Sequence, residues 1–418
     1  MKSTLAAGGV WLGLQPSLRA LAPSEKLNIA VIGAGGQGKA NLNASGKENV
    51  VAICDVDESR AGDAFDKHPK AKKFHDFRKM FDSMEKEIDA VAISTPDHTH
   101  FHTAFWAMQR GKHVYLEKPL AHEVWEVRKL TQLAKEKKLA TQLGAQRHTM
   151  TGLRQSVEIV RAGVIGEVSE VHSWIGGDRG MSAIPKDKPA VPSHVKWDLW
   201  LGPNADFNFH PSICPYGWRF WWQFGTGETG NWGCHILDIP FWALNLKYPT
   251  RVEASGPEVH GLTTPKSMNT SFLFPAEGSR GPVTLHWYHA KNGPPILEKH
   301  GLKAGGFNNL FIGSKGMLLC GFNSWKLLPE DKFQGVKAPK TFADSPGFHQ
   351  EWFDAIRGGK TATCNFDYSG PMTETVLLGN VAYRAGGFAW DSANLQCQGN
   401  PKAQALIQRQ YRKGWEIS

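Results

Sequence analysis

The stretch LNIAVIGAGGQGKANLNASGKENVVAICD, residues 27–55, decides the fold of the N-terminal part of this chain. An apolar run ends at three closely spaced glycines, Gly33, Gly35 and Gly38, and an apparent helix then leads to a second apolar run that stops at Asp55. Between a strand and a helix, such glycines allow a tight turn, a close backbone approach to a pyrophosphate and close helix packing. The helix N-terminus also offers free N–H groups to phosphates. The stretch therefore predicts a dinucleotide-binding Rossmann unit.

The acidic residue at the end of the second strand indicates which dinucleotide binds. Asp55 stands where a carboxylate accepts the hydroxyls of the adenosine ribose and would repel a 2′-phosphate, so we expect NAD rather than NADP. Arg60, close by, is the only feature that favours NADP. The expected cofactor-binding residues are Gly33, Ala34, Gly35, Gly36, Gln37, Gly38, Asp55, Ser94, Thr95, Pro96, His100, Glu117 and Lys118.

Length and composition are those of a globular chain with two or three domains. The 418 residues, 41% of them hydrophobic, are ample for a sizeable core. The formal charge of +9 would suit an anionic partner, but the basic residues are scattered, so we read them as a solvated face and expect no nucleic-acid partner. The six cysteines lie far apart without a C-x-x-C pair, which gives no indication of a metal knuckle or redox motif.

The first 25 residues look like an export leader. The run STLAAGGVWLGL, residues 3–14, resembles the hydrophobic part of a twin-arginine leader, although the arginine pair is missing. An A-x-A-like boundary follows at residues 20–22. The run is too short and too rich in glycine for a membrane span, so we expect no membrane partner. We predict an exported or periplasmic protein; the alternative is a cytoplasmic one in which this segment is a plain extension.

The pattern of expected strands and helices and the local composition divide the remaining chain into two domains. Residues 26–147 alternate strand and helix, which predicts a doubly wound parallel sheet that binds ligand beyond the carboxyl ends of its strands. Residues 148–418 contain a long Pro-, Gly- and Trp-rich stretch, 176–230, of the kind that forms a lid or binding surface. The later segments predict a C-terminal α/β domain with an open, largely antiparallel sheet. Its expected strands are 168–174, 252–255, 271–274, 283–289, 310–312 and 317–320.

Five motifs together resemble one known family. They are VIGAG (31–35), STP (94–96), GKHV (111–114) leading to EKPLA (117–121), and GCHILD (233–238). This combination is similar to the glucose-fructose oxidoreductase, inositol dehydrogenase and rhizopine-catabolism family, Gfo/Idh/MocA. The resemblance covers essentially everything from Lys26 onward. It implies a second domain whose sheet faces the nicotinamide and often makes an oligomer interface, so we expect a homo-oligomer, a dimer or tetramer.

The resemblance also assigns roles near the reacting carbon. In the family, the Lys of Glu-Lys-Pro and the His of Gly-x-His lie beside the substrate hydroxyl, which corresponds here to Lys118 and His235. An Asp often precedes the His by four residues, whereas this chain has Asn231, which carries no charge and can only orient substrate. The chemistry agrees, because hydride removal from a carbinol needs a base for the hydroxyl proton and a cation for the developing alkoxide. His235 suits the base and Lys118 the cation.

The substrate class is indicated by tryptophans between residues 197 and 232. Their flat apolar faces are of the kind that stacks on sugar rings, although core packing explains some of them. The expected substrate contacts are Trp218, Arg219, Trp232 and Asp238. The cluster His98, His100 and His102 is not read as a metal site, because residues two apart diverge on a helix.

These observations favour an NAD-dependent oxidoreductase that transfers hydride between nicotinamide and a secondary hydroxyl, or the ketone, of a small carbohydrate, sugar derivative or cyclitol. The alternative is a redox-neutral NAD-dependent glycoside hydrolase or lyase that works through a transient 3-keto sugar. A third possibility is a non-catalytic sugar sensor, against which Lys118 and His235 argue.

Overall fold

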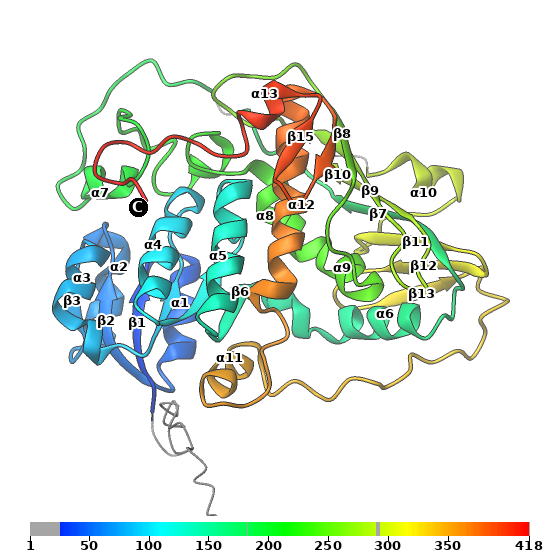
Figure 1. The fold of residues 1–418 in the computed structure, drawn as a ribbon, viewed down its shortest axis with the longest axis horizontal. Coiled ribbons are helices and arrows are strands. Elements are labelled where there is room, and N and C mark those ends of the chain that lie inside the picture. The colour runs from blue at the N-terminus through cyan, green and yellow to red at the C-terminus, as the bar shows by residue number, and fades with distance from the viewer. Residues whose placement is uncertain (1–25, 182, 290–292, 418) are drawn as a thin grey trace, which may run out of the picture.

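The computed structural model describes residues 26–417, apart from 182 and 290–292. The leader-like segment, 1–25, lies outside the described residues. The described chain forms two sheets with helices around them, and the long helix α12 (Phe366–Ala385) stands between the two halves (Figure 1). The predicted α/β class, with a Rossmann sheet followed by an open and largely antiparallel sheet, is confirmed.

The first sheet is parallel throughout, in the order β3-β2-β1-β4-β5-β6. Its central strands are apolar runs because helices cover both faces of a doubly wound sheet; in β1, Ile29 to Ile32 are at most 3% exposed. The strands are β1 (Asn28–Ile32), β2 (Asn49–Cys54), β3 (Lys72–Phe74), β4 (Ala90–Ile93), β5 (His113–Glu117) and β6 (Thr141–Gly144). The helices are α1 (Gln37–Ser45), α2 (Glu58–Lys67), α3 (Phe77–Met84), α4 (Asp97–Gln109) and α5 (Val124–Glu136).

The second sheet has nine strands in the order β13-β12-β11-β7-β10-β9-β8-β14-β15. Its pairs are antiparallel except β7 with β10, which is parallel. The strands are β7 (Val168–Ile175), β8 (Arg251–Ser255), β9 (Met268–Phe274), β10 (Val283–His289), β11 (Asn309–Gly313), β12 (Gly316–Cys320), β13 (Trp325–Leu328), β14 (Phe388–Asp391) and β15 (Gln396–Gln398).

Helices cover one face of this second sheet. Burial alternates along β10, where Val283, Leu285 and Trp287 are fully buried, as expected for a sheet packed on one side. The covering helices are α6 (Thr151–Arg161), α8 (Gly227–Ile236), α9 (Asp238–Leu244) and α12. Helix α12 also packs along α5, where Arg128 and the buried Glu374 form an ion pair at 2.7 Å. The helix layer therefore joins the two sheets.

Several boundaries differ from the prediction for local reasons. Helix α4 was expected from residue 100 but begins at Asp97, directly after Pro96. Helix α12 was expected from 372 but begins at Phe366, because the Asn365 side chain caps it and Pro371 is accommodated within it. The expected loop 176–230 contains α7 (Trp197–Leu201) and the start of α8. Strand β3 and strands β13 to β15 were missed, since runs of three or four residues give little periodicity.

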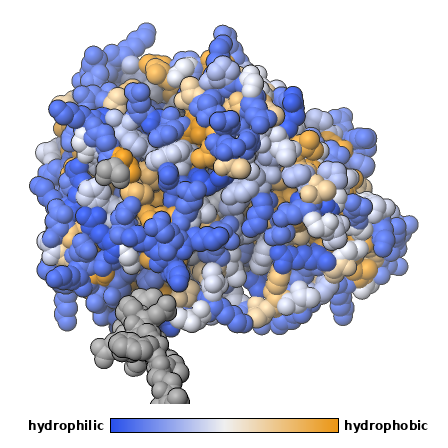
Figure 2. All heavy atoms as spheres, in the orientation of Figure 1, coloured by the Kyte–Doolittle hydropathy of each residue, from blue (hydrophilic) through white to orange (hydrophobic). Residues whose placement is uncertain are grey.

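Hydrophilic residues cover most of the face drawn in Figure 2, with small apolar patches between them. Across residues 26–417 with their gaps, the helices fall short of the length and apolar character that a bilayer crossing requires. The remaining helices are α10 (Pro295–Lys299), α11 (Phe348–Ile356) and α13 (Pro401–Gln404).

Candidate active site

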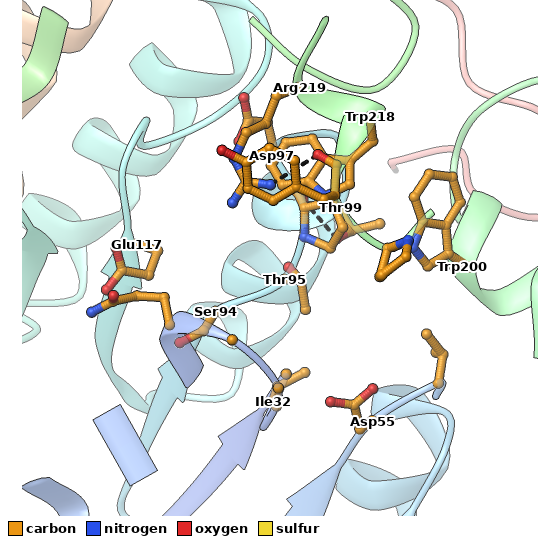
Figure 3. A pocket seen from close by; sticks show the side chains of 18 of the residues that line it. Ile32, Asp55, Ser94, Thr95, Asp97, Thr99, Glu117, Trp200, Trp218 and Arg219 are labelled. Carbon is orange, nitrogen blue, oxygen red and sulfur yellow. Dashed lines mark hydrogen bonds between the residues drawn. The ribbon is translucent and has the colours of Figure 1, made fainter. Parts of the chain in front are cut away.

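A cavity of about 560 Å³ lies where the carboxyl ends of the first sheet meet segments of the second domain. The strand ends contribute Asp55, Ser94 and Thr95, and the facing segments contribute Trp200 and Arg219 (Figure 3). Doubly wound sheets bind ligands at this edge. The cavity therefore occupies the position that the strand order predicts.

The glycine turn allows backbone contacts that no other residue permits. Gly33 has φ of +81°, and a Cβ there would lie 2.7 Å from the Ser94 carbonyl oxygen. A Cβ on Gly38 would lie 2.0 Å from the Gly33 carbonyl oxygen, so α1 packs directly against the turn. Gly33, Gly35, Gly36 and Gln37 line the cavity at the N-terminus of α1, where a pyrophosphate would meet backbone N–H groups.

Asp55 and Arg60 stand at this end of the cavity. The Asp55 carboxylate accepts hydrogen bonds from the backbone N–H groups of Ala34 at 2.8 Å and Asp57 at 2.9 Å, which holds it beside the glycine turn. Burial raises the pKa of Asp55, and these N–H donors oppose the rise. A guanidinium nitrogen of Arg60 lies 2.8 Å from the point a Cβ on Gly36 would occupy. Arg60 is thus at the phosphate turn.

Glu117 lines the cavity and belongs to a buried hydrogen-bond network. Its carboxylate accepts hydrogen bonds from Asn41 at 2.8 Å and Gln146 at 2.7 Å, and Asn41 also donates to the Ser94 hydroxyl. Burial raises the pKa of Glu117, opposed by those donors and by Lys118. The network fixes the ends of β4 and β5 relative to α1, so the neighbouring Lys118 starts from a rigid position.

The Lys118 ammonium reaches across the domain boundary to helix α8. It donates to the backbone carbonyl of Asn231 at 2.8 Å and to the Asn231 side-chain oxygen at 3.1 Å. Burial lowers the pKa of Lys118, while Asp97 and Glu117 oppose that shift. Two of its three protons are used by Asn231, which leaves one donor for a ligand.

A carboxylate that the sequence did not single out stands behind Asn231. The Asn231 amide donates to Glu228 at 3.1 Å, one helical turn earlier, and Glu228 is only 2% exposed. Arg179 forms an ion pair with the other oxygen of Glu228. The neutral amide therefore links the Lys118 ammonium to a buried carboxylate, and a second carboxylate at position 231 would face Glu228 directly.

Asn231→Asp is therefore expected to change the pH profile of turnover more than the maximal rate. A second carboxylate about 3 Å from Glu228 raises the pKa of the pair through like-charge repulsion, and Lys118 and Arg179 oppose part of that rise. In the folded protein this raised pKa adds stability at low pH that is lost as pH rises through it, so the variant should lose thermal stability relative to the unmodified protein between about pH 5 and about pH 8. Thermal unfolding across that range checks this. Asn231→Ala, which adds no charge, should lack that slope and mainly raise KM.

His235 also lines the cavity, near the C-terminal end of α8. Burial lowers its pKa well below the ordinary value of 6.5, and the positive charges of Lys118 and Arg147 lower it further. The imidazole is therefore neutral at pH 7 and can accept a proton. Within the described part of the chain its buried Nδ1 has no hydrogen-bond partner.

The tryptophans divide between the cavity and the core. Trp200, Trp218 and Trp232 line the cavity. Trp221 is 1% exposed and Trp222 packs near Tyr383, so these two support the structure. Core packing thus explains part of the set, and stacking on a sugar ring stays a prediction for the three tryptophans that line the cavity.

Four of the predicted residues lie outside the set that lines the cavity: Ala34, Gly38, His100 and Asp238. The first two shape the glycine turn through contacts already described. The ring nitrogens of His100 face the carbonyl oxygens of Thr95 at 2.8 Å and Pro119 at 2.7 Å. His100 therefore joins two strand-end turns.

Asp238 does not face the cavity where substrate contact was expected. Helix α8 ends at Ile236 and α9 starts at Asp238, so the side chain turns into the core, where it is 0% exposed. There its carboxylate bonds to His148 at 2.8 Å and to Tyr368 at 2.5 Å. This placement corrects the expected substrate contact: the carboxylate ties helices together instead.

The histidines of α4 diverge, as the helix geometry predicted. The rings of His98, His100 and His102 bond to separate backbone carbonyls, those of Trp200 and Phe224, of Thr95 and Pro119, and of Trp415. A different group, Glu170, His172 and His286, lies on the second sheet. Glu170 Oε1 lies 2.9 and 3.2 Å from the Nε2 atoms of His172 and His286. Burial lowers the pKa of both histidines, so these contacts join the carboxylate to neutral imidazoles.

Several lining residues escaped the sequence reasoning. Arg147, Arg179 and Trp415 line the cavity, although they stand far from any motif. Trp415 arrives because the C-terminal segment returns to the first domain, where it packs on Phe77 and Arg78 (Figure 1). Of these three, only Arg147 could have been predicted from the sequence. It follows β6 by three residues, and the carboxyl ends of parallel strands lie at the same edge of the sheet, where the ligand binds.

Comparison with known proteins agrees with this architecture. Residues 27–145 match GFO_IDH_MocA, described as "Oxidoreductase family, NAD-binding Rossmann fold". Inositol 2-dehydrogenase of Salmonella typhimurium is 30% identical over 169 residues, 39% of this chain and 48% of that protein. A glycosyl hydrolase family 109 protein of Solibacter usitatus is 31% identical over 216 residues, 46% of this chain and 45% of that one. The chain thus spans about half the length of the curated relatives it matches.

Solved structures share the fold over most of the chain. The WlbA dehydrogenase from Chromobacterium violaceum, in complex with NADH and UDP-GlcNAcA, superposes with a TM-score of 0.60 at 16% identity, covering 87% of this chain and 95% of that one. Levoglucosan dehydrogenase in complex with NADH gives 0.55 at 17% identity, covering 84% and 96%. At such identities the likeness concerns the fold alone.

Proposed function

We propose that the chain is a member of the Gfo/Idh/MocA family, whose NAD-binding model matches residues 27–145. On this basis it transfers hydride between NAD and a secondary hydroxyl, or the matching ketone, of a sugar, sugar derivative or cyclitol. The observation that carries the proposal is one cavity that joins the glycine turn and Asp55 to Lys118 and His235. A neutral buried imidazole, that of His235, and a buried ammonium, that of Lys118, in one cavity favour a catalytic function over a protein that only binds a ligand.

The residues present fit a dinucleotide. Gly33, Gly35 and Gly36 offer the close approach for a pyrophosphate, Arg60 offers a countercharge there, and Asp55 offers acceptors for ribose hydroxyls. When bound, NAD supplies a nicotinamide that accepts or returns a hydride. Arg60 lies beside Gly35 and Gly36, so we assign its charge to the pyrophosphate and the preference for NAD to Asp55.

The chain's own residues handle the proton and the charge. His235, neutral at pH 7, takes the hydroxyl proton of the substrate in the oxidative direction. Lys118 donates its remaining N–H to the same oxygen and stabilises the negative charge that develops there. Asn231 fixes the ammonium, and Glu228 fixes Asn231. The tryptophans on the facing segments offer flat surfaces to the sugar ring.

A second candidate is a redox-neutral NAD-dependent glycoside hydrolase or lyase. The likeness to a glycosyl hydrolase family 109 protein over 216 residues favours keeping it. Both candidates need the same base and cation, because each begins by oxidising a hydroxyl.

Turnover of free sugars and of aryl glycosides separates the two candidates. The full chain, supplied with NAD, is mixed with monosaccharides and cyclitols, and NADH is followed by absorbance; the aryl glycosides report release of the phenol. Accumulating NADH on a free sugar supports the dehydrogenase. Phenol release without NADH supports the hydrolase. Tight NAD binding without NADH or phenol formation would support the third possibility, a non-catalytic sugar sensor.

Asp55→Ala is expected to weaken NAD binding by about 10- to 100-fold and to narrow the gap to NADP, since hydrogen bonds to a carboxylate are lost along with its repulsion of a 2′-phosphate. Asp55→Asn serves as the matched variant, because it keeps one acceptor and removes only the charge. Calorimetry with both cofactors measures the effect. NADP binding by the unmodified protein as tight as NAD binding would contradict the assignment.

Two further expectations remain proposals. An exported or periplasmic location rests on the leader-like residues 1–25, and a dimer or tetramer rests on the resemblance to the family.

A further inference from the structure

The substrate end of the cavity holds an arginine with no acidic partner. The Arg147 guanidinium lies between two aromatic rings, 5.1 Å from the centroid of Trp232 and 4.5 Å from that of Phe322. Across the described ranges, 26–417 with their gaps, its side chain makes neither an ion pair nor a hydrogen bond. Aromatic faces hold a guanidinium in place while leaving its in-plane N–H donors unused.

Arg219 has a similar environment on the facing segment. Its guanidinium lies 4.4 Å from the Tyr216 ring and 4.2 Å from the Trp218 ring. Its one hydrogen bond to the described residues goes to the Tyr216 carbonyl at 3.1 Å. The charge of Asp97 opposes the lowering of the Arg219 pKa by burial. The Asp97 carboxylate accepts a hydrogen bond from the Thr226 hydroxyl at 2.7 Å, and among the described residues it forms no ion pair with Arg219.

The remaining arginines of the cavity have their charges matched. Arg179 pairs with the buried Glu228, and Arg60 lies at the glycine turn, where the pyrophosphate of NAD would answer it. Arg60 would thus pair with the negative charge of the cofactor's pyrophosphate at the glycine turn. Arg147 and Arg219 are left as two cations without an ion pair among the described residues of the cavity that also holds Lys118 and His235. The charge of Arg147 acts on His235, and that of Arg219 acts on Lys118.

We infer that the substrate is an anionic sugar derivative, and that Arg147 and Arg219 bind its carboxylate or phosphate oxygens. This inference rests on the proposed function. A planar guanidinium donates two parallel hydrogen bonds to a pair of anionic oxygens, a geometry that a neutral hydroxyl does not match. The aromatic rings on each arginine limit its motion, so little side-chain entropy is lost on binding.

Matched pairs of neutral and acidic sugars test the inference. The full chain with NAD is assayed on D-glucose against D-glucuronate, D-galactose against D-galacturonate, and D-glucose against D-glucose 6-phosphate, which separates carboxylate from phosphate. We expect kcat/KM to favour one class of acid by at least about 10-fold. Arg147→Gln and Arg219→Gln should each lower kcat/KM for that acid by about 10- to 100-fold and change the neutral sugar only a few-fold.

Two variants sharpen the result. Arg147→Lys keeps the charge without the paired donors and should recover part of the loss. Arg161→Gln is the control, because Arg161 also stacks on aromatic rings, Trp242 and Phe342, but lies outside the cavity, and its kinetics should match the unmodified protein. The KM for NAD should stay unchanged in both glutamine variants; a rise confined to NAD would overturn the substrate role.

Different results would contradict the anionic substrate class and the dehydrogenase activity. A clear preference for neutral sugars, with NADH formed, would overturn the anionic class and leave the dehydrogenase intact. Acids that bind the NAD-loaded protein in calorimetry without turnover would support the anionic class and count against the dehydrogenase. If no acid is turned over, and none binds more tightly than its neutral partner, the inference is wrong.

Discussion

Replacing His235 with alanine is expected to lower turnover by about 10²- to 10⁴-fold, the range for loss of a positioned general base. The imidazole is neutral at pH 7 because burial and the charges of Lys118 and Arg147 disfavour its protonated form. Without it, the proposed base for the hydroxyl proton is missing from the cavity that holds Lys118. Cofactor binding should survive, since the residues that fit NAD come from the first domain.

Steady-state kinetics on whichever sugar proves active, with NAD binding measured separately, checks this expectation. His300→Ala is the control, because His300 is an exposed histidine outside the cavity. The acid limb of the pH profile should lie below 6.5, since the pKa of His235 is lowered from that value, and activity should fall as pH drops through the limb. Near-normal turnover in His235→Ala would remove it as the base.

The first domain was predictable because its signals are local. The strand at Ile29 to Ile32, the glycine turn and Asp55 lie within 29 consecutive residues, and their spacing alone specifies a strand, a turn, a helix and a strand. Lys118 and His235 came from short motifs, and the structure brings both to one cavity although 117 positions separate them in the sequence.

The parts that sequence reasoning missed depend on tertiary packing. Glu228 is an unremarkable acid near the end of an expected loop until α8 begins at Gly227 and stacks it one turn from Asn231. Asp238 is the opposite case, because it was expected to contact the substrate and lies in the core. It belongs to the same short motif as His235, but α8 ends at Ile236, α9 starts at Asp238 and the side chain turns inward. Periodicity carries no information about such a break.

The same limit explains why the charge of the cavity was not foreseen. Arg147 and Arg179 are two of 48 basic residues, and only the folded chain shows that one is paired with Glu228 and the other is not. Scattered along the sequence, they read as solvated side chains. Whether an arginine has an acidic partner depends on residues that are distant in the sequence. The composition therefore predicts the net charge of the protein but not where unpaired charges lie in the fold.

Lys118→Ala is expected to lower turnover by about 10²- to 10⁴-fold while NAD binding and folding persist. The variant removes the cation that we propose meets the developing alkoxide, and it leaves the Asn231 carbonyl and side-chain oxygen without their donor. Lys118→Arg keeps the charge but is too bulky and differently shaped for the same two bonds, so it should recover only part of the rate.

The pH profile distinguishes this role from a merely structural one. If the charged ammonium is required, activity falls as pH rises through the pKa of Lys118, which burial lowers from 10.5, so the alkaline limb should lie below that value. In Lys118→Ala this limb should disappear from the residual activity, whereas Lys299→Ala, an exposed lysine outside the cavity, should keep it. An unchanged alkaline limb in Lys118→Ala would show that another group titrates there, and the cation role would then pass to one of the unpaired arginines.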